Sequence, residues 1–208
     1  MDFQNSDTDI PQRRRCSWVT TDLLAAYHDD EWGRAPTTDA GWLEMVILET
    51  FQAGISWRVV LQKRDAMREV FGQFDPGRLA EFGAGDVERL LSDSRIIRNR
   101  RKIEAAIKNA RVAVNLAREF GSLENFFAGL TNMDEAAICE RLQAVFHGVG
   151  FTTAQSIAYA TGLVPPPHES GCWLASAPST IAQPWRIKEE CNGVKSSKPD
   201  DDVDNPTE

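Results

Sequence analysis

The chain has 208 residues, of which 42% are apolar and 26% charged, with a formal net charge of −8. This length is sufficient for one or two domains with a substantial core, and no 18-residue apolar run is present, which excludes a transmembrane helix. The polar N-terminus predicts no signal peptide, and four cysteines in a chain this long predict no disulfide scaffold, so we expect a reducing cellular compartment.

The predicted elements are helices. Residues 1–14 are expected to be a disordered leader, and the helical pattern begins at Thr38. Thr38 or Asp39 caps a helix over 39–53 that ends at Gly54, and Ser56 caps the next helix, over 57–71. Asp75 and Pro76 open a short helix, and further helices are expected over residues 85–91, 99–119, 122–129, 133–146 and 151–161. No segment alternates with period two, so the sequence predicts an all-α fold.

Residues 15–175 are expected to form a single domain, and the polar, acidic residues 176–208 a disordered tail. Residues 189–208 carry seven acids and two lysines, a net charge of −5, which leaves −3 for the rest of the chain. Residues 95–111 hold seven bases against one acid. Because local patches decide phosphate binding, the acidic total does not exclude DNA, although such a run also suits a solvated helix face.

Two cysteines and two histidines have the residue types of a structural zinc site. Cys16 lies twelve residues before His28, and His168 lies four residues before Cys172. Two Cys and two His complete a closed tetrahedral shell, which would tie the N-terminal segment to the C-terminal one. The alternative is that these are ordinary structural residues.

A glycine-containing turn separates the last two predicted helices. Gly148 and Gly150, on either side of Val149, permit positive φ and let backbone amides approach a phosphate closely. Helix-hairpin-helix units use such a turn to hold one DNA backbone without reading its sequence. A plain helix–helix turn is the alternative.

An acidic residue, Glu49, interrupts the first apolar helix of this pattern. A carboxylate beside a buried stripe is costly unless it is paired or functional. Trp18, Tyr27, Trp32 and Trp57 lie nearby in the sequence. An acid among aromatic rings suits recognition of a planar base, while a buried ion pair within an aromatic core is the alternative.

Together these residues resemble the 3-methyladenine DNA glycosylase I (Tag) family of the helix-hairpin-helix superfamily. The matching strings include Cys-Ser-Trp-Val at 16–19, Tyr-His-Asp-Asp-Glu-Trp-Gly at 27–33 and Leu-Glu-Thr-Phe-Gln-Ala-Gly-Ile-Ser-Trp at 48–57. Others are Phe-Asp-Pro at 74–76, Ile-Ile-Arg-Asn-Arg-Arg-Lys-Ile at 96–103 and Gly-Leu-Val at 162–164. The resemblance covers residues 14–174 in the family's order.

The resemblance implies a helix-hairpin-helix glycosylase fold with structural Zn²⁺ on Cys16, His28, His168 and Cys172. It implies a DNA-3-methyladenine glycosylase, a hydrolase that repairs double-stranded alkylated DNA by cleaving the N-glycosidic bond of a flipped base. Glu49 would be the catalytic residue. The substrate-binding residues would be Tyr27, Trp57, Trp18 and Trp32, and the DNA-binding residues Gly148, Val149 and Gly150.

Residues 151–168 contain neither Asp nor Lys, which fits a monofunctional hydrolase rather than an abasic-site lyase. The chain departs from the family pattern at Leu24, at 158–161 and at 165–167, which concerns one pocket wall and the surroundings of the hairpin. We expect a cytoplasmic monomer, nuclear in a eukaryote, that associates with no membrane. Two alternatives stay open: a Tag-like protein that binds damaged DNA with weak catalysis, and a zinc-stapled helical interaction module.

Overall fold

A computed structural model describes residues 13–175; the expected tail at 176–208 and all but the last two residues of the expected leader lie outside this range. The described residues are helical, without strands, so the all-α prediction is confirmed for them. None of their helices is long and apolar enough to cross a membrane. The elements are α1 (Asp22–Asp30), α2 (Asp39–Gln52), α3 (Trp57–Val70), a 3-10 helix η1 (Gly72–Phe74), α4 (Pro76–Ala80), α5 (Ala84–Ser92), α6 (Arg100–Phe120), α7 (Leu123–Ala128), α8 (Glu135–Val145) and α9 (Phe151–Ala160).

Local signals explain where several of these helices begin and end. The Thr38 hydroxyl accepts a hydrogen bond from the Gly41 N–H at the start of α2 (3.1 Å), and Asp75 caps α4 in the same way. Gly121 ends α6 with φ at 88°, a left-handed conformation that favours glycine. Ser56 occupies the N-cap position of α3, as expected, although its hydroxyl makes no capping hydrogen bond.

Helix α1 lies before Thr38, where the helical pattern was expected to begin. The Thr21 hydroxyl caps it by accepting a hydrogen bond from the Leu24 N–H at 3.3 Å. Its nine residues bury Leu24, Tyr27 and His28, and the helix packs against α3. So short a helix depends on tertiary packing for its stability, which accounts for its weak signal in the sequence.

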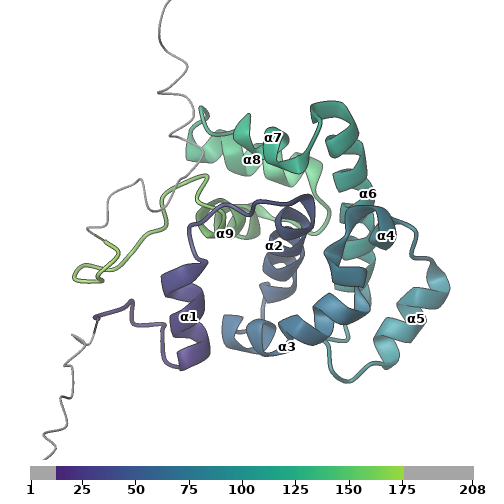
Figure 1. Ribbon diagram of the computed structural model, residues 1–208, viewed down its shortest axis with the longest axis horizontal. Coiled ribbons are helices and arrows are strands. Elements are labelled where there is room, and N and C mark those ends of the chain that lie inside the picture. Colours follow the sequence, from purple (N-terminus) through teal and green to yellow (C-terminus); the bar gives the residue numbers. More distant parts are fainter. Residues whose placement is uncertain (1–12, 176–208) are drawn as a thin grey trace, which may run out of the picture.

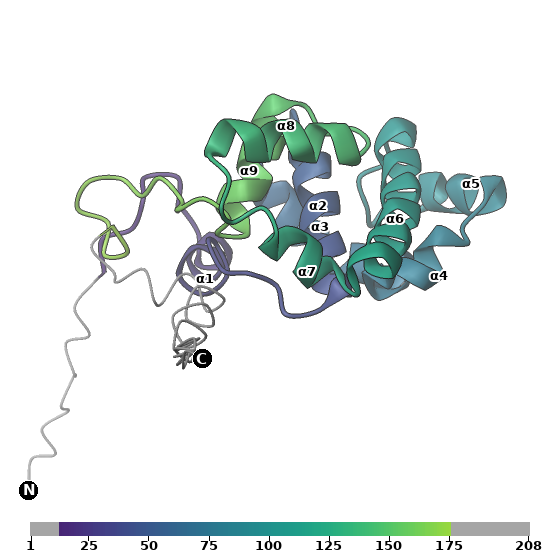
Figure 2. The same cartoon turned by 90° about the horizontal axis from the view of Figure 1, so that it is seen from above.

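Helix α2 is the central element of the fold. Its residues 42–51 are all buried, and it contacts α3, α4, α6, α7 and α9. Figure 1 shows α2 in the middle, with α1 and α9 on one side, α6 on the other and α7 and α8 above. Seen from above, α6 again lies on the side of α2 away from α1 (Figure 2). A side chain on α2 is therefore enclosed by neighbouring helices.

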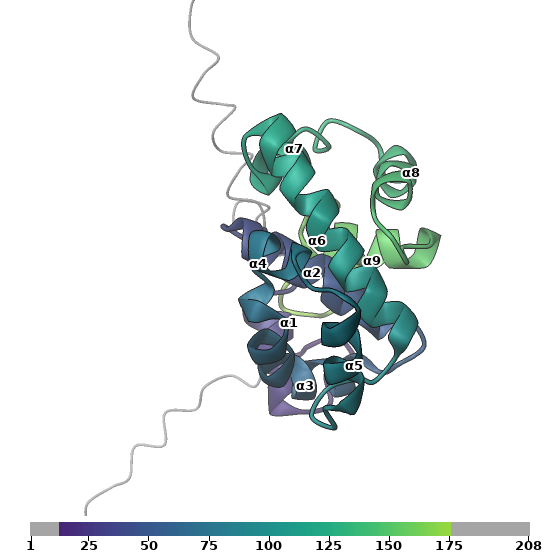
Figure 3. The ribbon, with the colours of Figure 1, turned by 90° about the vertical axis from the view of Figure 1, so that its right-hand side faces the viewer.

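The turn between α8 and α9 is where the sequence analysis expects a hairpin, and it is fastened to two other helices. Gly148 has φ at 74°, and a Cβ there would lie 3.2 Å from Thr50 Cγ2 on α2 and 3.3 Å from Ala105 Cβ on α6. The amide of Asn109, a fully buried residue of α6, accepts a hydrogen bond from the His147 N–H (2.7 Å) and donates one to the His147 carbonyl (3.1 Å). Figure 3 shows α6 along this side of the molecule with α8 and α9 beside it.

Replacing Asn109 with Ala is expected to lower the free energy of unfolding by about 1–3 kcal/mol, because two hydrogen bonds to the hairpin are lost. Asn115→Ala is the matched control: Asn115 is an exposed residue of the same helix, so its replacement should change stability by less than about 0.5 kcal/mol. Denaturant unfolding of both variants measures the difference. Equal stabilities would show that Asn109 does not hold the hairpin.

Candidate functional site

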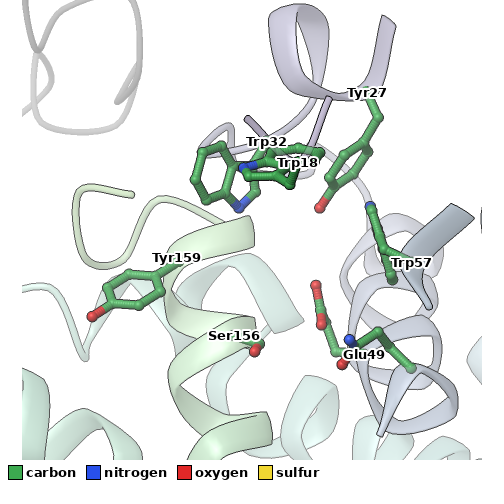
Figure 4. A pocket seen from close by; sticks show the side chains of 8 residues that line it. Trp18, Tyr27, Trp32, Glu49, Trp57, Ser156 and Tyr159 are labelled. Carbon is green, nitrogen blue, oxygen red and sulfur yellow. The ribbon is translucent and has the colours of Figure 1, made fainter. Parts of the chain in front are cut away.

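A cavity of about 380 Å³ opens between the N-terminal segment, α2, α3 and α9. We call it the aromatic pocket and define it by the eight side chains that line it. These are Trp18, Tyr27, Trp32, Glu49, Gln52, Trp57, Ser156 and Tyr159 (Figure 4). The structure thus brings together the acid and all four aromatic residues that the sequence analysis singled out.

The carboxyl group of Glu49 lies at the inner end of the aromatic pocket and points toward Tyr27 (Figure 4). Its residue is only 6% exposed, and it makes no hydrogen bond or ion pair with any described residue. Burial raises the pKa of Glu49 from 4.5 to about 8. Glu44, on the same helix, is instead paired with Arg64 and Arg68, so Glu49 is a buried acid that lacks its own counter-ion.

Two hydrogen-bond donors face the same space without a partner among the described residues. They are the Tyr27 hydroxyl and the Trp57 indole N–H, whose rings lie 4.9 Å apart. Burial and the nearby Glu49 raise the pKa of Tyr27 well above its usual value, so its hydroxyl remains protonated. Buried polar groups are usually paired, so two free donors beside a free acceptor indicate a place for a polar ligand.

Trp18 and Trp32 form the aromatic wall of the pocket opposite Glu49. Their rings meet edge to face at 5.2 Å, and Trp18 lies 6.5 Å from the Tyr27 ring. Indole faces are electron-rich and attract cations. The arrangement therefore suits a flat ligand that carries positive charge and hydrogen-bonding edges.

The four predicted metal ligands also come together, at the end of the domain where the N- and C-terminal segments meet. The candidate ligand atoms of Cys16, His28, His168 and Cys172 lie within 4.8 Å of one another. His28 Nδ1 lies 2.8 Å from Asp29 Oδ1, which leaves Nε2 free to face Cys172 Sγ at 3.5 Å. A carboxylate behind a ligating imidazole is the usual support of a metal site.

Asp29 is itself held as a carboxylate. Burial raises its pKa, but hydrogen bonds from Arg15, His28 and Trp173 outweigh that effect and lower the pKa to about 2. The Arg15 guanidinium lies 2.7 Å from Asp29 Oδ2, and the Trp173 indole N–H donates to Oδ1 at 3.1 Å. These contacts connect residues at both ends of the described chain.

The Cys/His cluster also supports the pocket wall. The Trp18 ring lies 5.3 Å from the His28 ring, and the Trp32 ring lies 4.8 Å from the His168 ring. The two tryptophan rings therefore pack against the imidazoles of the cluster.

The sequence does not single out the lining residues Gln52 and Ser156, whereas Tyr159 lies within 158–161, where a changed pocket wall is expected. Gln52 stands three residues after Glu49 on α2, and this helical spacing was a usable signal. Ser156 and Tyr159 come from α9, which only the tertiary fold brings beside α2. The Tyr159 hydroxyl points away from the cavity and donates to Glu135 Oε1 at 2.7 Å, so its ring serves as a side wall (Figure 4).

Known proteins are similar to this chain in sequence and in fold. A family model described as methyladenine glycosylase matches residues 18–163. DNA-3-methyladenine glycosylase 1 of Escherichia coli (strain K12) is 44% identical over 119 residues, 57% of this chain and 64% of that protein. The corresponding Haemophilus influenzae protein is 37% identical over a stretch of the same length, again 64% of the protein. The matched stretch thus spans less than two thirds of these curated relatives.

Solved structures extend the comparison over more of the chain. A crystal structure of a 3-methyladenine DNA glycosylase I matches with a TM-score of 0.71 at 37% identity, covering 77% of this chain and 98% of that one. A tyrosine-to-phenylalanine variant of such an enzyme, in complex with 3-methyladenine, matches with a TM-score of 0.66 at 26% identity, covering 74% and 99%. Since the family model spans well over half of the sequence and includes the whole aromatic pocket, the chain belongs to the methyladenine glycosylase family.

Proposed function

We propose that the protein is a monofunctional DNA glycosylase that hydrolyses the N-glycosidic bond of 3-methyladenine in alkylated duplex DNA. The observation that carries the proposal is the buried, unpartnered Glu49 in a pocket of aromatic rings. A neutral ligand would leave its carboxyl group protonated, whereas a cationic base supplies the missing counter-charge. Adenine alkylated at N3 and still attached to DNA is such a cation.

The flipped base would lie among the aromatic rings, with its edge toward Glu49, the Tyr27 hydroxyl and the Trp57 N–H. The positive charge of the lesion already weakens the bond between C1′ and N9. When this bond breaks, the electron pair remains on the base, which leaves as a neutral molecule and needs no protonation. Water adds its oxygen to C1′ and releases a proton. Ionised Glu49 favours this course by stabilising the positive charge of base and sugar.

The lining of the aromatic pocket also favours hydrolysis alone. A lyase needs an amine that attacks C1′, and no lysine is among the eight lining side chains. Backbone contact would come from the hairpin, whose Gly148 and Gly150 let amides of the turn approach a phosphate while Val149 anchors it by burial. The expected partner is therefore duplex DNA.

The Cys/His cluster fits a structural zinc ion. Two thiols and two imidazoles, one of them backed by Asp29, are the donor set of closed tetrahedral sites. Cys16, His28, His168 and Cys172 would hold the ion, which would supply cross-linking of the two chain ends rather than reaction chemistry. Its effect on the reaction would pass through the positions of Trp18 and Trp32.

The first experiment measures base release from methylated duplex DNA by chromatography of the freed purines. We expect free 3-methyladenine without strand cleavage, and Glu49→Gln should slow the release about 100-fold or more. Glu69→Gln, a change at an exposed acid, is the matched control and should leave the rate unchanged. A folded wild-type protein that binds the DNA but frees no base would contradict the proposal and favour the damaged-DNA-binding alternative.

The pH dependence of kcat/KM should report the ionisation of Glu49 in the free protein. Since burial raises its pKa to about 8, kcat/KM is expected to rise with pH up to about 8 and then level off. Below that pH, binding of a cation must first displace the proton. Glu49→Gln should abolish the rising limb; a limb that survives in this variant would assign it to another group.

Stability should show the opposite trend. Folding raises the pKa of Glu49 from 4.5 to about 8, so between these values the folded state binds more protons and loses stability as pH rises. Glu49→Gln is therefore expected to be about 2–5 kcal/mol more stable than the wild type at pH 9 and close to it at pH 5. Denaturant unfolding at both pH values checks this, and a difference independent of pH would refute it.

Metal analysis should find about one zinc ion per wild-type chain. Cys172→Ser is expected to lose the ion and lower the melting temperature, because the two chain ends are no longer cross-linked. Cys139→Ala is the control: Cys139 is buried outside the cluster, so this variant should keep the metal. Chelation of the wild type should reproduce the loss of thermal stability. A Cys172→Ser protein with its full metal content would disprove the assignment.

A further inference from the structure

The seven bases of residues 95–111 fall into two groups. Four of them bond to acids or carbonyl groups of the protein itself: Arg95, Arg100, Lys102 and Arg111. Within the described part of the chain, the other three have no such partner: Arg98, Arg101 and Lys108. Long basic side chains that the protein does not use are available to an external anion.

Two of the free bases lie on the hairpin side of α6. Arg101, Ala105 and Lys108 follow the spacing i, i+4 and i+7, which places them on one face of a helix. Ala105 marks where that face meets the hairpin, since its Cβ is 3.3 Å from the position of a Cβ on Gly148. Arg101 and Lys108 are exposed and stand on either side of this contact, about 10 Å apart along the helix.

The two bases and the hairpin form one fixed surface. The pair of hydrogen bonds between Asn109 and the backbone of His147 prevents the turn from moving relative to α6. His147, Gly148 and Gly150 are exposed beside the bases, and residues 146–161 contain no acid. On α6, the acid Glu104 stands three residues after Arg101 and four before Lys108, and it pairs with Arg100 Nη1 at 3.9 Å. The hairpin itself therefore adds no negative charge to this surface, although the whole chain carries a net charge of −8.

We infer that Arg101 and Lys108 bind backbone phosphates of duplex DNA on the two sides of the hairpin. The inference rests on the proposed function and adds two contacts that the glycine turn alone does not supply. Such contacts hold the duplex in register without reading its sequence, as a search for rare lesions requires. In an acidic protein they would also provide much of the salt-dependent attraction to DNA.

The test is equilibrium binding of a short undamaged duplex between about 50 and 200 mM salt, followed by fluorescence anisotropy. The double variant R101A/K108A is expected to bind about 10-fold more weakly, and its plot of log affinity against log salt should be less steep by about 2. Arg118→Ala is the matched control, because Arg118 is exposed and unpaired on the same helix, about 220° around the axis from Ala105. It should leave both quantities unchanged.

Two further measurements separate the failure of this inference from that of the proposed function. Binding of free 3-methyladenine, followed by tryptophan fluorescence, should be the same in R101A/K108A and the wild type, because neither base lines the aromatic pocket. Base release by the wild type with an unchanged salt slope in R101A/K108A overturns this inference alone. An equal loss in Arg118→Ala overturns it as well, since overall charge would then explain the effect. A wild type that neither binds DNA nor frees a base overturns both.

Discussion

Glu49 is buried without a counter-ion, and the helices that enclose α2 hold it in that environment. Removing a carboxylate from water costs several kcal/mol unless it is paired. Glu44, five residues earlier on α2, meets the same condition through Arg64 and Arg68. Glu49 has only the open space of the aromatic pocket in front of it. In the proposed function a cationic ligand would supply the missing counter-charge, so selectivity for such a ligand would follow from electrostatics before any shape is considered.

The wall that faces Glu49 depends on chain segments far apart in the sequence. The Ser17 backbone N–H and hydroxyl both donate to the Glu169 carboxylate. The backbone N–H of Trp173 donates to the Arg14 carbonyl at 2.8 Å. These bonds close the described chain on itself beside the Cys/His cluster. Trp18 and Trp32 are thereby fixed by residues that do not line the pocket. A short N-terminal segment with little core of its own gains rigidity in this way.

Sequence patterns predicted what local chemistry determines. The caps at Thr38 and Asp75 and the glycine at 121 indicated the starts of α2 and α4 and the end of α6, and Glu49 was identifiable because an acid is out of place in an apolar stripe. Helix α1 was not predicted because it is stabilised by tertiary contacts of its buried face and shows little periodicity in its sequence. Ser156 was not predicted for a related reason, since no local signal indicates that α9 folds back beside α2. The seven bases of residues 95–111 overstate the positive charge available to DNA, because composition does not reveal which of them the protein pairs internally.

The contact of Gly148 with both α2 and α6 explains how these parts work together. Gly148 lies against Thr50, the residue that follows Glu49 on α2, and against Ala105 on α6. A Cβ at this position would crowd both neighbours, and its positive φ is itself unfavourable for other residues. In the proposed function the turn holds the DNA backbone, so its distance from Glu49 sets how far a flipped base reaches into the aromatic pocket. Displacements of about 1 Å can cost two orders of magnitude in rate. A close contact between the hairpin and the helix that carries Glu49 would keep the spacing between them fixed.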